Sequence, residues 1–161
     1  MVSYGKKKRE ERGMKKTYAW LLCAGWMGVI YLMSAMPGDV SGEQSGLIVD
    51  CLLGMIRFLF GAEAAASISV DTAGFLVRKA AHMAEYAVLF LLYRRALALS
   101  GAHHPGLAAL VMSAGYAMTD EWHQGFVAGR SPSPVDIGID TLGAAIAWGA
   151  HAIFDRIRHR T

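Results

Sequence analysis

A run of twenty residues without any charge, Thr17–Met36 (TYAWLLCAGWMGVIYLMSAM), constrains the fold of this chain more than any other feature. As a helix it is about 30 Å long, close to the thickness of the hydrocarbon core of a bilayer. Inside a bilayer a helix satisfies all of its own backbone hydrogen bonds. The length of the run and its terminal Trp and Tyr side chains favour an uncleaved membrane span over a signal peptide.

Three more apolar segments predict further membrane crossings, at Phe75–Leu92, Gly106–Phe126 and Ile137–Phe154. The chain is 54% hydrophobic, which is high for a soluble protein and typical of membrane proteins. Gly46–Gly61 is apolar but short and carries two charges, so we expect an interfacial or re-entrant amphipathic helix there. The predicted fold class is therefore an all-α membrane protein with four transmembrane helices and this one additional helix.

Positive charge predicts how these spans are oriented. Seven of the sixteen Lys and Arg residues precede residue 17, Arg94 and Arg95 follow the second span, and three Arg close the chain. The positive-inside bias puts all three clusters in the cytoplasm, which gives an N-in, C-in topology. Residues 1–16 and 155–161 are then basic cytoplasmic tails around a transmembrane domain at 17–154. Nucleic-acid binding is the weaker interpretation of such clusters, and we expect no nucleic-acid partner.

Polar side chains gather in the outer halves of the three later spans under this topology. They are Arg78, Lys79, His82 and Glu85 in the second span, Asp120, Glu121, His123 and Gln124 in the third, Asp136 directly before the fourth and Asp140 within it, and Arg130 in the connecting loop. Steps of three and four residues place members of each set on a common helical face. Because charge within a bilayer turns inward, we expect a hydrated pocket open to the extracytoplasmic side.

Two other interpretations of these residues remain open. Arg78 with Glu85, or Arg130 with Asp136, would form ion pairs that only fix the packing of the helices. A metal site is chemically possible, because His82 and Glu85 are one helical turn apart. The three basic side chains disfavour a bound cation and instead suit an anion such as a phosphate or carboxylate. We therefore assign no metal ligand, and the sequence identifies no cofactor.

The remaining histidines and cysteines receive no role. His103 and His104 lie in a predicted turn, and His151 stands alone on an apolar helix. Cys23 and Cys51 have no metal-binding or redox spacing, and Cys23 is predicted to be a packing residue.

Four motifs together resemble the VanZ-like family, which is named for a membrane protein associated with teicoplanin resistance. They are SAMPG with Ser41 and Ser45, RKAAHMAEYAVLFLLY at 78–93, DEWHQGFVAGR at 120–130, and DIGIDTLGA at 136–144. The second motif adds Tyr86 to the candidate substrate-binding residues. Asp140 stands where Asn is common in the family, and Ala128 where Pro is frequent. The resemblance implies a helical membrane bundle, multi-pass in the bacterial cytoplasmic membrane, and an association with glycopeptide resistance.

Three functions remain open. The first is an enzyme acting on a lipid-linked or anionic cell-envelope substrate at the outer leaflet. In that case Glu85, Asp120 and Glu121 join His82 and His123 as catalytic candidates, and Arg78, Lys79 and Arg130 bind the anion together with Gln124, Asp136 and Asp140. The second is non-catalytic head-group binding, transport or partnership with envelope enzymes. The third is a purely structural polar network, and the oligomeric state is left open in each case.

Overall fold

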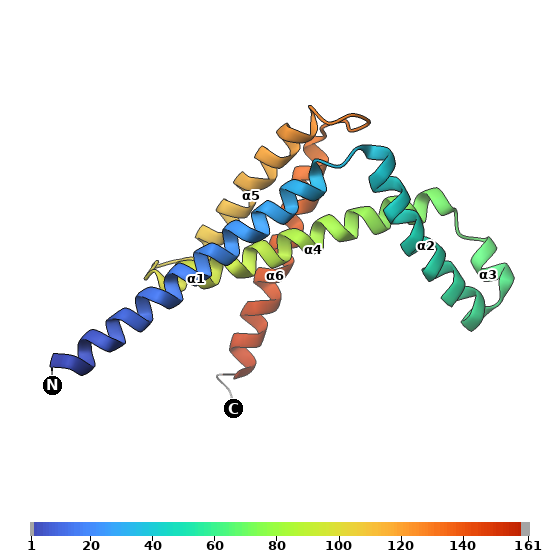
Figure 1. Ribbon diagram of the computed structural model, residues 1–161. Coiled ribbons are helices and arrows are strands. Elements are labelled where there is room, and N and C mark those ends of the chain that lie inside the picture. The colour runs from blue at the N-terminus through green and yellow to red at the C-terminus, as the bar shows by residue number, and fades with distance from the viewer. Residues whose placement is uncertain (1, 159–161) are drawn as a thin grey trace.

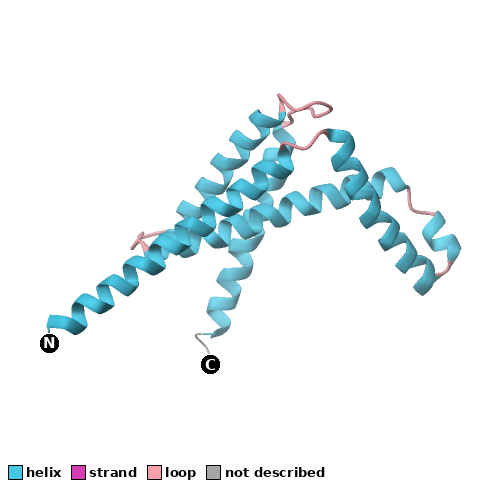
Figure 2. Cartoon of the chain, in the orientation of Figure 1, coloured by secondary structure: helices cyan, strands magenta, loops and turns pink. Residues whose placement is uncertain are grey.

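The computed structural model of this chain describes residues 2–158, and these form six helices joined by short connections (Figures 1 and 2). The helices are α1 (Val2–Ser34), α2 (Gly38–Phe60), α3 (Ala62–Ala66), α4 (Val70–Leu99), α5 (Pro105–Gln124) and α6 (Pro134–Arg158). No strand is present among the described residues. The expected all-α class is therefore confirmed.

Two helices are long and apolar enough to cross a membrane, judged by length and composition over the described residues. They are the Lys7–Ser34 portion of α1 and the whole of α6, Pro134–Arg158. Large apolar side chains such as Leu21, Leu32 and Ile146 are more than half exposed on their surfaces. An apolar outer surface of this kind suits contact with lipid.

Four of the helices, α1, α2, α4 and α6, are longer than the segments predicted from the sequence, whereas α5 ends two residues earlier than predicted. α1 begins at Val2, so the basic segment expected as a tail is helical and continuous with the apolar run. α2 begins at Gly38 instead of Gly46, directly after Pro37, and α4 begins at Val70, where the Ser69 side chain caps it. The side chain of Lys6 and residues 159–161, which include Arg160, lie outside the described part of the chain.

α4 is the central helix of the bundle and packs against α1, α2, α5 and α6. Its side chains Tyr86, Leu89 and Phe90 are fully buried. Gly143 of α6 lies against the main chain of Met83, where a Cβ atom would collide with the Met83 carbonyl. The backbones of α4 and α6 thus approach closely at Gly143, as a residue without a side chain allows.

α2 and α3 form an arm beside this bundle. In Figure 1 α2 turns away from the end of α1 and runs across its direction, while α3 lies at the far end of the arm. α2 contacts α3 and α4, and many of its apolar side chains remain exposed. The other four long helices, α1, α4, α5 and α6, form the packed bundle beside this arm.

We expect Gly143→Ala to destabilise the bundle, because the added methyl group collides with the Met83 backbone, which cannot move aside alone. Overpacking of this kind costs about 1–3 kcal/mol. Thermal unfolding in lipid nanodiscs measures the effect, with Gly149→Ala on the same helix as control, since an added Cβ there meets nothing within 4 Å. Equal melting temperatures for the two variants would contradict the packing described here.

Candidate functional site

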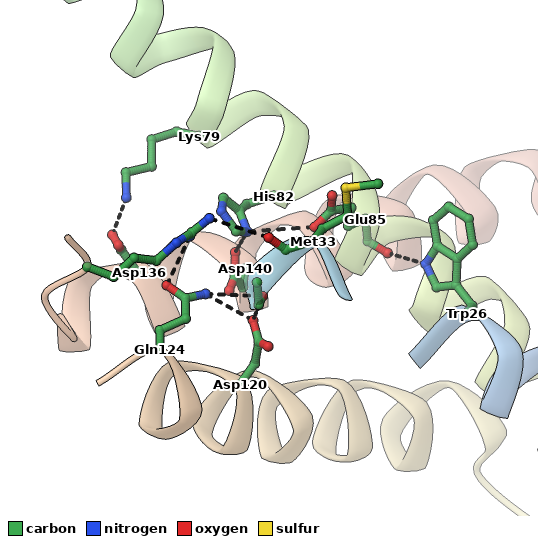
Figure 3. Close-up of polar contacts among 11 residues, drawn as sticks. Trp26, Met33, Lys79, His82, Glu85, Asp120, Gln124, Asp136 and Asp140 are labelled. Carbon is green, nitrogen blue, oxygen red and sulfur yellow. Dashed lines mark hydrogen bonds and ion pairs between the residues drawn. The ribbon is translucent and has the colours of Figure 1, made fainter. Parts of the chain in front are cut away.

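Asp120 of α5 is a buried carboxylate that joins α5 to the end of α1. The Ser34 hydroxyl at the end of α1 donates a hydrogen bond of 2.7 Å to Asp120 Oδ2. Gln124 Nε2 lies 3.2 Å from both the Ser34 oxygen and the same carboxylate oxygen, as Figure 3 shows for Gln124 and Asp120. All three side chains are buried, so protein donors replace water at Asp120 Oδ2, while Oδ1 is buried without a hydrogen-bond partner in the described part of the chain.

Arg130, in the loop between α5 and α6, holds the end of α1. Its Nε donates to the Met36 carbonyl at 3.1 Å and its Nη2 to the Met33 carbonyl at 3.4 Å, while Nη1 reaches Gln124 Oε1 at 3.3 Å. Carbonyls at a helix C-terminus lack partners within the helix and carry partial negative charge. A guanidinium in this place therefore satisfies them and fixes the loop against α1.

Two glycines allow this loop to come so close. Gly38 N donates a 3.1 Å hydrogen bond to the Ala128 carbonyl, and a Cβ on Gly38 would collide with the backbone of Gly129. Gly129 has a φ of 72°, in the left-handed region that side chains other than glycine rarely adopt. Gly129 thus forms the turn that places the Arg130 side chain against the end of α1.

His82 of α4 lies between two carboxyl groups (Figure 3). Its Nδ1 is 3.7 Å from Glu85 Oε2, on its own helix, and 4.0 Å from Asp140 Oδ1 of α6. Both separations exceed hydrogen-bond distance, so the imidazole has electrostatic neighbours but its Nδ1 lacks a protein partner within the described part of the chain. This nitrogen is therefore available to a ligand, a water molecule or a transferred proton.

An ion pair one helical turn before His82 joins α4 to α6. Lys79 Nζ forms an ion pair with Asp136 Oδ1 at 2.5 Å. Glu121 of α5 accepts a 2.5 Å hydrogen bond from the backbone N–H of Ser133, just before α6. These contacts bring the fourth, fifth and sixth helices together at the level of His82.

Hollow space surrounds His82. One cavity of about 160 Å³ lies between α1, α2 and α4 and is lined by Met33, Ser41, Ser45, Ile48, Val77, Arg78, Ala81, His82, Glu85 and Arg130. A second, of about 130 Å³, lies toward α6 and shares Arg78, His82 and Arg130 with the first. Each is large enough for several water molecules or a small ionic group.

Two guanidinium groups face this space without a close counter-charge. No described carboxylate lies within ion-pair distance of Arg78 or Arg130. The Nε atom of Arg78 is buried and has no hydrogen-bond partner among the described residues. A buried donor without a partner is costly, so a bound anion would complete the hydrogen bonding of Arg78.

The predicted site residues that line one or both cavities are Arg78, Lys79, His82, Glu85, Gln124, Arg130 and Asp136. Asp120, Glu121 and Asp140 line neither, although Asp120 accepts a hydrogen bond from Gln124 and Asp140 lies 4.0 Å from His82 Nδ1. The last two predicted residues turn elsewhere. His123 stacks on Tyr31 of α1, with ring centroids 4.4 Å apart, and lines neither cavity. Tyr86 is fully buried beside Tyr116 and likewise lines neither cavity.

The two ion pairs of the alternative, packing-only interpretation are not among those that form in the described part of the chain. Arg78 does not pair with Glu85, nor Arg130 with Asp136, because Asp136 binds Lys79 and Arg130 binds main-chain carbonyls. His151 was also expected to stand alone. It lies 3.0 Å from Asp155, the carboxylate that binds Arg94 of α4.

Sequence reasoning missed Ser34 and the carbonyl groups of α1. A hydroxyl three residues before Pro37, at the C-terminal end of an uncharged run, was the available signal. No group of three or more His, Cys, Asp or Glu side chains in the described chain is arranged to hold a metal ion.

The family model described as VanZ/LLP1 matches residues 19–155, which is most of the chain. The chain belongs to the VanZ-like family. No curated protein and no solved structure matches the chain. Every residue that lines the two cavities around His82 lies within the matched VanZ-like segment. Family membership and the apolar helices α1 and α6 are compatible with a membrane protein.

We expect Ser34→Ala to lower the free energy of unfolding by about 1–3 kcal/mol, because the buried Asp120 carboxylate loses its shortest donor. Ser113→Ala is the matched control, since the Ser113 hydroxyl is equally buried but has no described partner. Chemical unfolding in mild detergent compares the two. A loss no larger for Ser34→Ala than for Ser113→Ala would contradict the importance of the Asp120 contact.

Proposed function

We propose that α1, α4, α5 and α6 each cross the membrane, with both ends of the chain in the cytoplasm and α2 lying at the outer interface. The twenty residues of α5 amount to about 30 Å of helix, enough for one crossing. The basic residues Arg94 and Arg95 lie toward the end of α4 opposite His82. Under the positive-inside bias, the cavities around His82 then open to the extracytoplasmic side.

Reporter fusions test this topology. A periplasmic-type phosphatase inserted after Ser131 should be active, and the same enzyme inserted after His103 should be inactive. A cytoplasmic reporter should give the reverse pattern at the same two positions. Activity of the phosphatase at His103 alone would invert the orientation and remove the extracytoplasmic site.

The function that this site supports best is recognition of an anionic group, such as a phosphate, on a lipid-linked or cell-envelope substrate at the outer leaflet. The observation that carries this proposal is the pair Arg78 and Arg130, which line one cavity with His82 and have no carboxylate partner among the described residues. Arginine binds phosphate and carboxylate oxygens through several donors at once. The Arg130 side chain is already fixed by α1, so part of the site is preorganised.

A catalytic role for this site would use His82. Its unpaired Nδ1 would accept a proton from water or from a substrate hydroxyl, with Glu85 and Asp140 favouring the resulting imidazolium. Arg78 and Arg130 would stabilise the negative charge that develops on the bound group. A non-catalytic protein would use the same cavity to hold a head group, and would need no proton transfer at His82.

We expect Arg78→Gln to weaken the binding of methyl phosphate by about 10- to 100-fold, the effect of losing hydrogen bonds to a charged group. Calorimetric titration of the protein in phosphatidylcholine nanodiscs measures this affinity. Arg57→Gln is the control, because Arg57 is exposed on α2 and lines neither cavity. Equal affinities for the two variants would refute the anion site.

His82→Ala separates catalysis from binding. If the protein is an enzyme, this variant should lose activity toward envelope lipids, and teicoplanin susceptibility of an expressing host should change accordingly, with methyl phosphate affinity altered less than threefold. His103→Ala, in the exposed turn before α5, controls for histidine loss. Full activity of His82→Ala at equal membrane abundance would eliminate the catalytic role and leave the binding role.

A further inference from the structure

One face of α2 changes from polar to apolar as it leaves the His82 cavity. Its members follow steps of four, three, four, three and four residues, and they are Ser41, Ser45, Ile48, Leu52, Met55 and Leu59. This spacing keeps all six side chains on one side of the helix, which we call the α2 stripe. The first three line the cavity. The last three extend away from it along the arm.

The apolar part of the α2 stripe is not covered by the rest of the molecule. Ile48, Met55 and Leu59 are 51%, 54% and 65% exposed, although Val49 on the neighbouring side of α2 is fully buried. The stripe therefore lies along the edge of the surface that packs on α4. From Ile48 to Leu59 it extends about 16 Å, close to half the thickness of a bilayer hydrocarbon core.

The cavity lining itself combines polar and apolar side chains. Arg78, His82, Glu85 and Arg130 supply its charged and titratable groups, while Met33, Ile48 and Val77 supply apolar walls. The Arg78 guanidinium lies beside Gly42, within the first turns of α2, so the anion-binding groups sit at the polar end of the stripe. A head group bound there would have its attached chain directed toward Ile48 and Leu52.

We infer that the ligand of this site is an anionic lipid whose phosphate lies between Arg78 and Arg130 and whose hydrocarbon chain lies along the α2 stripe. The inference rests on the proposed function, because it takes the phosphate site as its starting point. What it adds is the class of substrate: a membrane amphiphile that enters sideways beside α2. Two uncompensated guanidiniums select a negative head group, and the continuous apolar stripe selects a chain.

Binding of methyl, butyl, octyl and dodecyl phosphate to the protein in phosphatidylcholine nanodiscs tests this inference. The affinity should rise at least tenfold from methyl to dodecyl phosphate as methylene groups leave water. Because dodecyl phosphate also partitions into the bilayer, the decisive comparison is between variants. The double variant Leu52→Ser, Met55→Ser should bind dodecyl phosphate at least fivefold more weakly and methyl phosphate unchanged.

Leu47→Ser is the matched control for this comparison. Leu47 is 74% exposed on α2, and it precedes Ile48 by one residue, which places it about 100° around the helix from the stripe. This variant should bind both phosphates as the unsubstituted protein does. Dodecyltrimethylammonium, which has the same chain and a positive head group, should not compete with dodecyl phosphate.

Each possible result decides something. If methyl phosphate binds in an Arg78-dependent way but the stripe variant and Leu47→Ser bind dodecyl phosphate equally, the lipid inference is overturned and the anion site stands. If dodecyltrimethylammonium competes as well as dodecyl phosphate does, the stripe is a nonspecific apolar surface and the inference also fails. If Arg78→Gln leaves methyl phosphate binding unchanged, the proposed function falls, and the lipid inference falls with it.

Discussion

The carboxylate of Asp120 is held inside the bundle by the Ser34 hydroxyl and the Gln124 amide, and the arrangement of the site follows from that contact. Burying a carboxylate costs several kcal/mol unless donors replace its water. Supplying those donors fixes the end of α1 against α5. Gln124 then accepts from Arg130, whose other donors bind the Met33 carbonyl in the last turn of α1 and the Met36 carbonyl just after this helix. These contacts fix the position of the loop before α6. They thereby fix Arg130, which lines the cavity beside His82.

Some of the charged side chains around His82 have a partner of opposite charge or a hydrogen-bond donor, and others have none in the part of the chain that the structure describes. Lys79 and Asp136 neutralise each other, and Glu121 accepts from the start of α6, so these groups join helices. Arg78 and Arg130 have no such carboxylate among the described residues, and His82 keeps an unpaired Nδ1. A network built only for packing would gain stability by pairing them. Arg78, Arg130 and His82 line one cavity together, and this meeting of two guanidinium groups and an imidazole is the physical basis for proposing a binding role. Other buried polar atoms without partners in the described chain, such as the hydroxyls of Tyr86 and Ser113, lie away from it.

Much of this arrangement could be predicted from the sequence, because helical periodicity fixes which residues share a face. The steps of four and three residues along α4 placed Arg78, His82 and Glu85 on one line, and the structure sets all three on one cavity. Partner choice could not be predicted. Whether Asp136 binds Lys79 or Arg130 depends on a loop conformation set by Gly129. The contact of His123 with Tyr31 could not be predicted because the two rings lie on helices that are distant in sequence. The number of crossings and the chemical roles remain predictions.

For the proposed function, His82 must lie in a water-filled, positively charged hollow on the outer side of the membrane. The most direct measurement is the reaction of His82→Cys, on a Cys51→Ser background, with charged thiosulfonates added outside intact cells. The ratio of anionic to cationic reagent rates should be well above the same ratio at the exposed native Cys51, because Arg78 and Arg130 attract anions. Reaction only from the cytoplasmic side, or faster reaction with the cationic reagent, would contradict the proposed function.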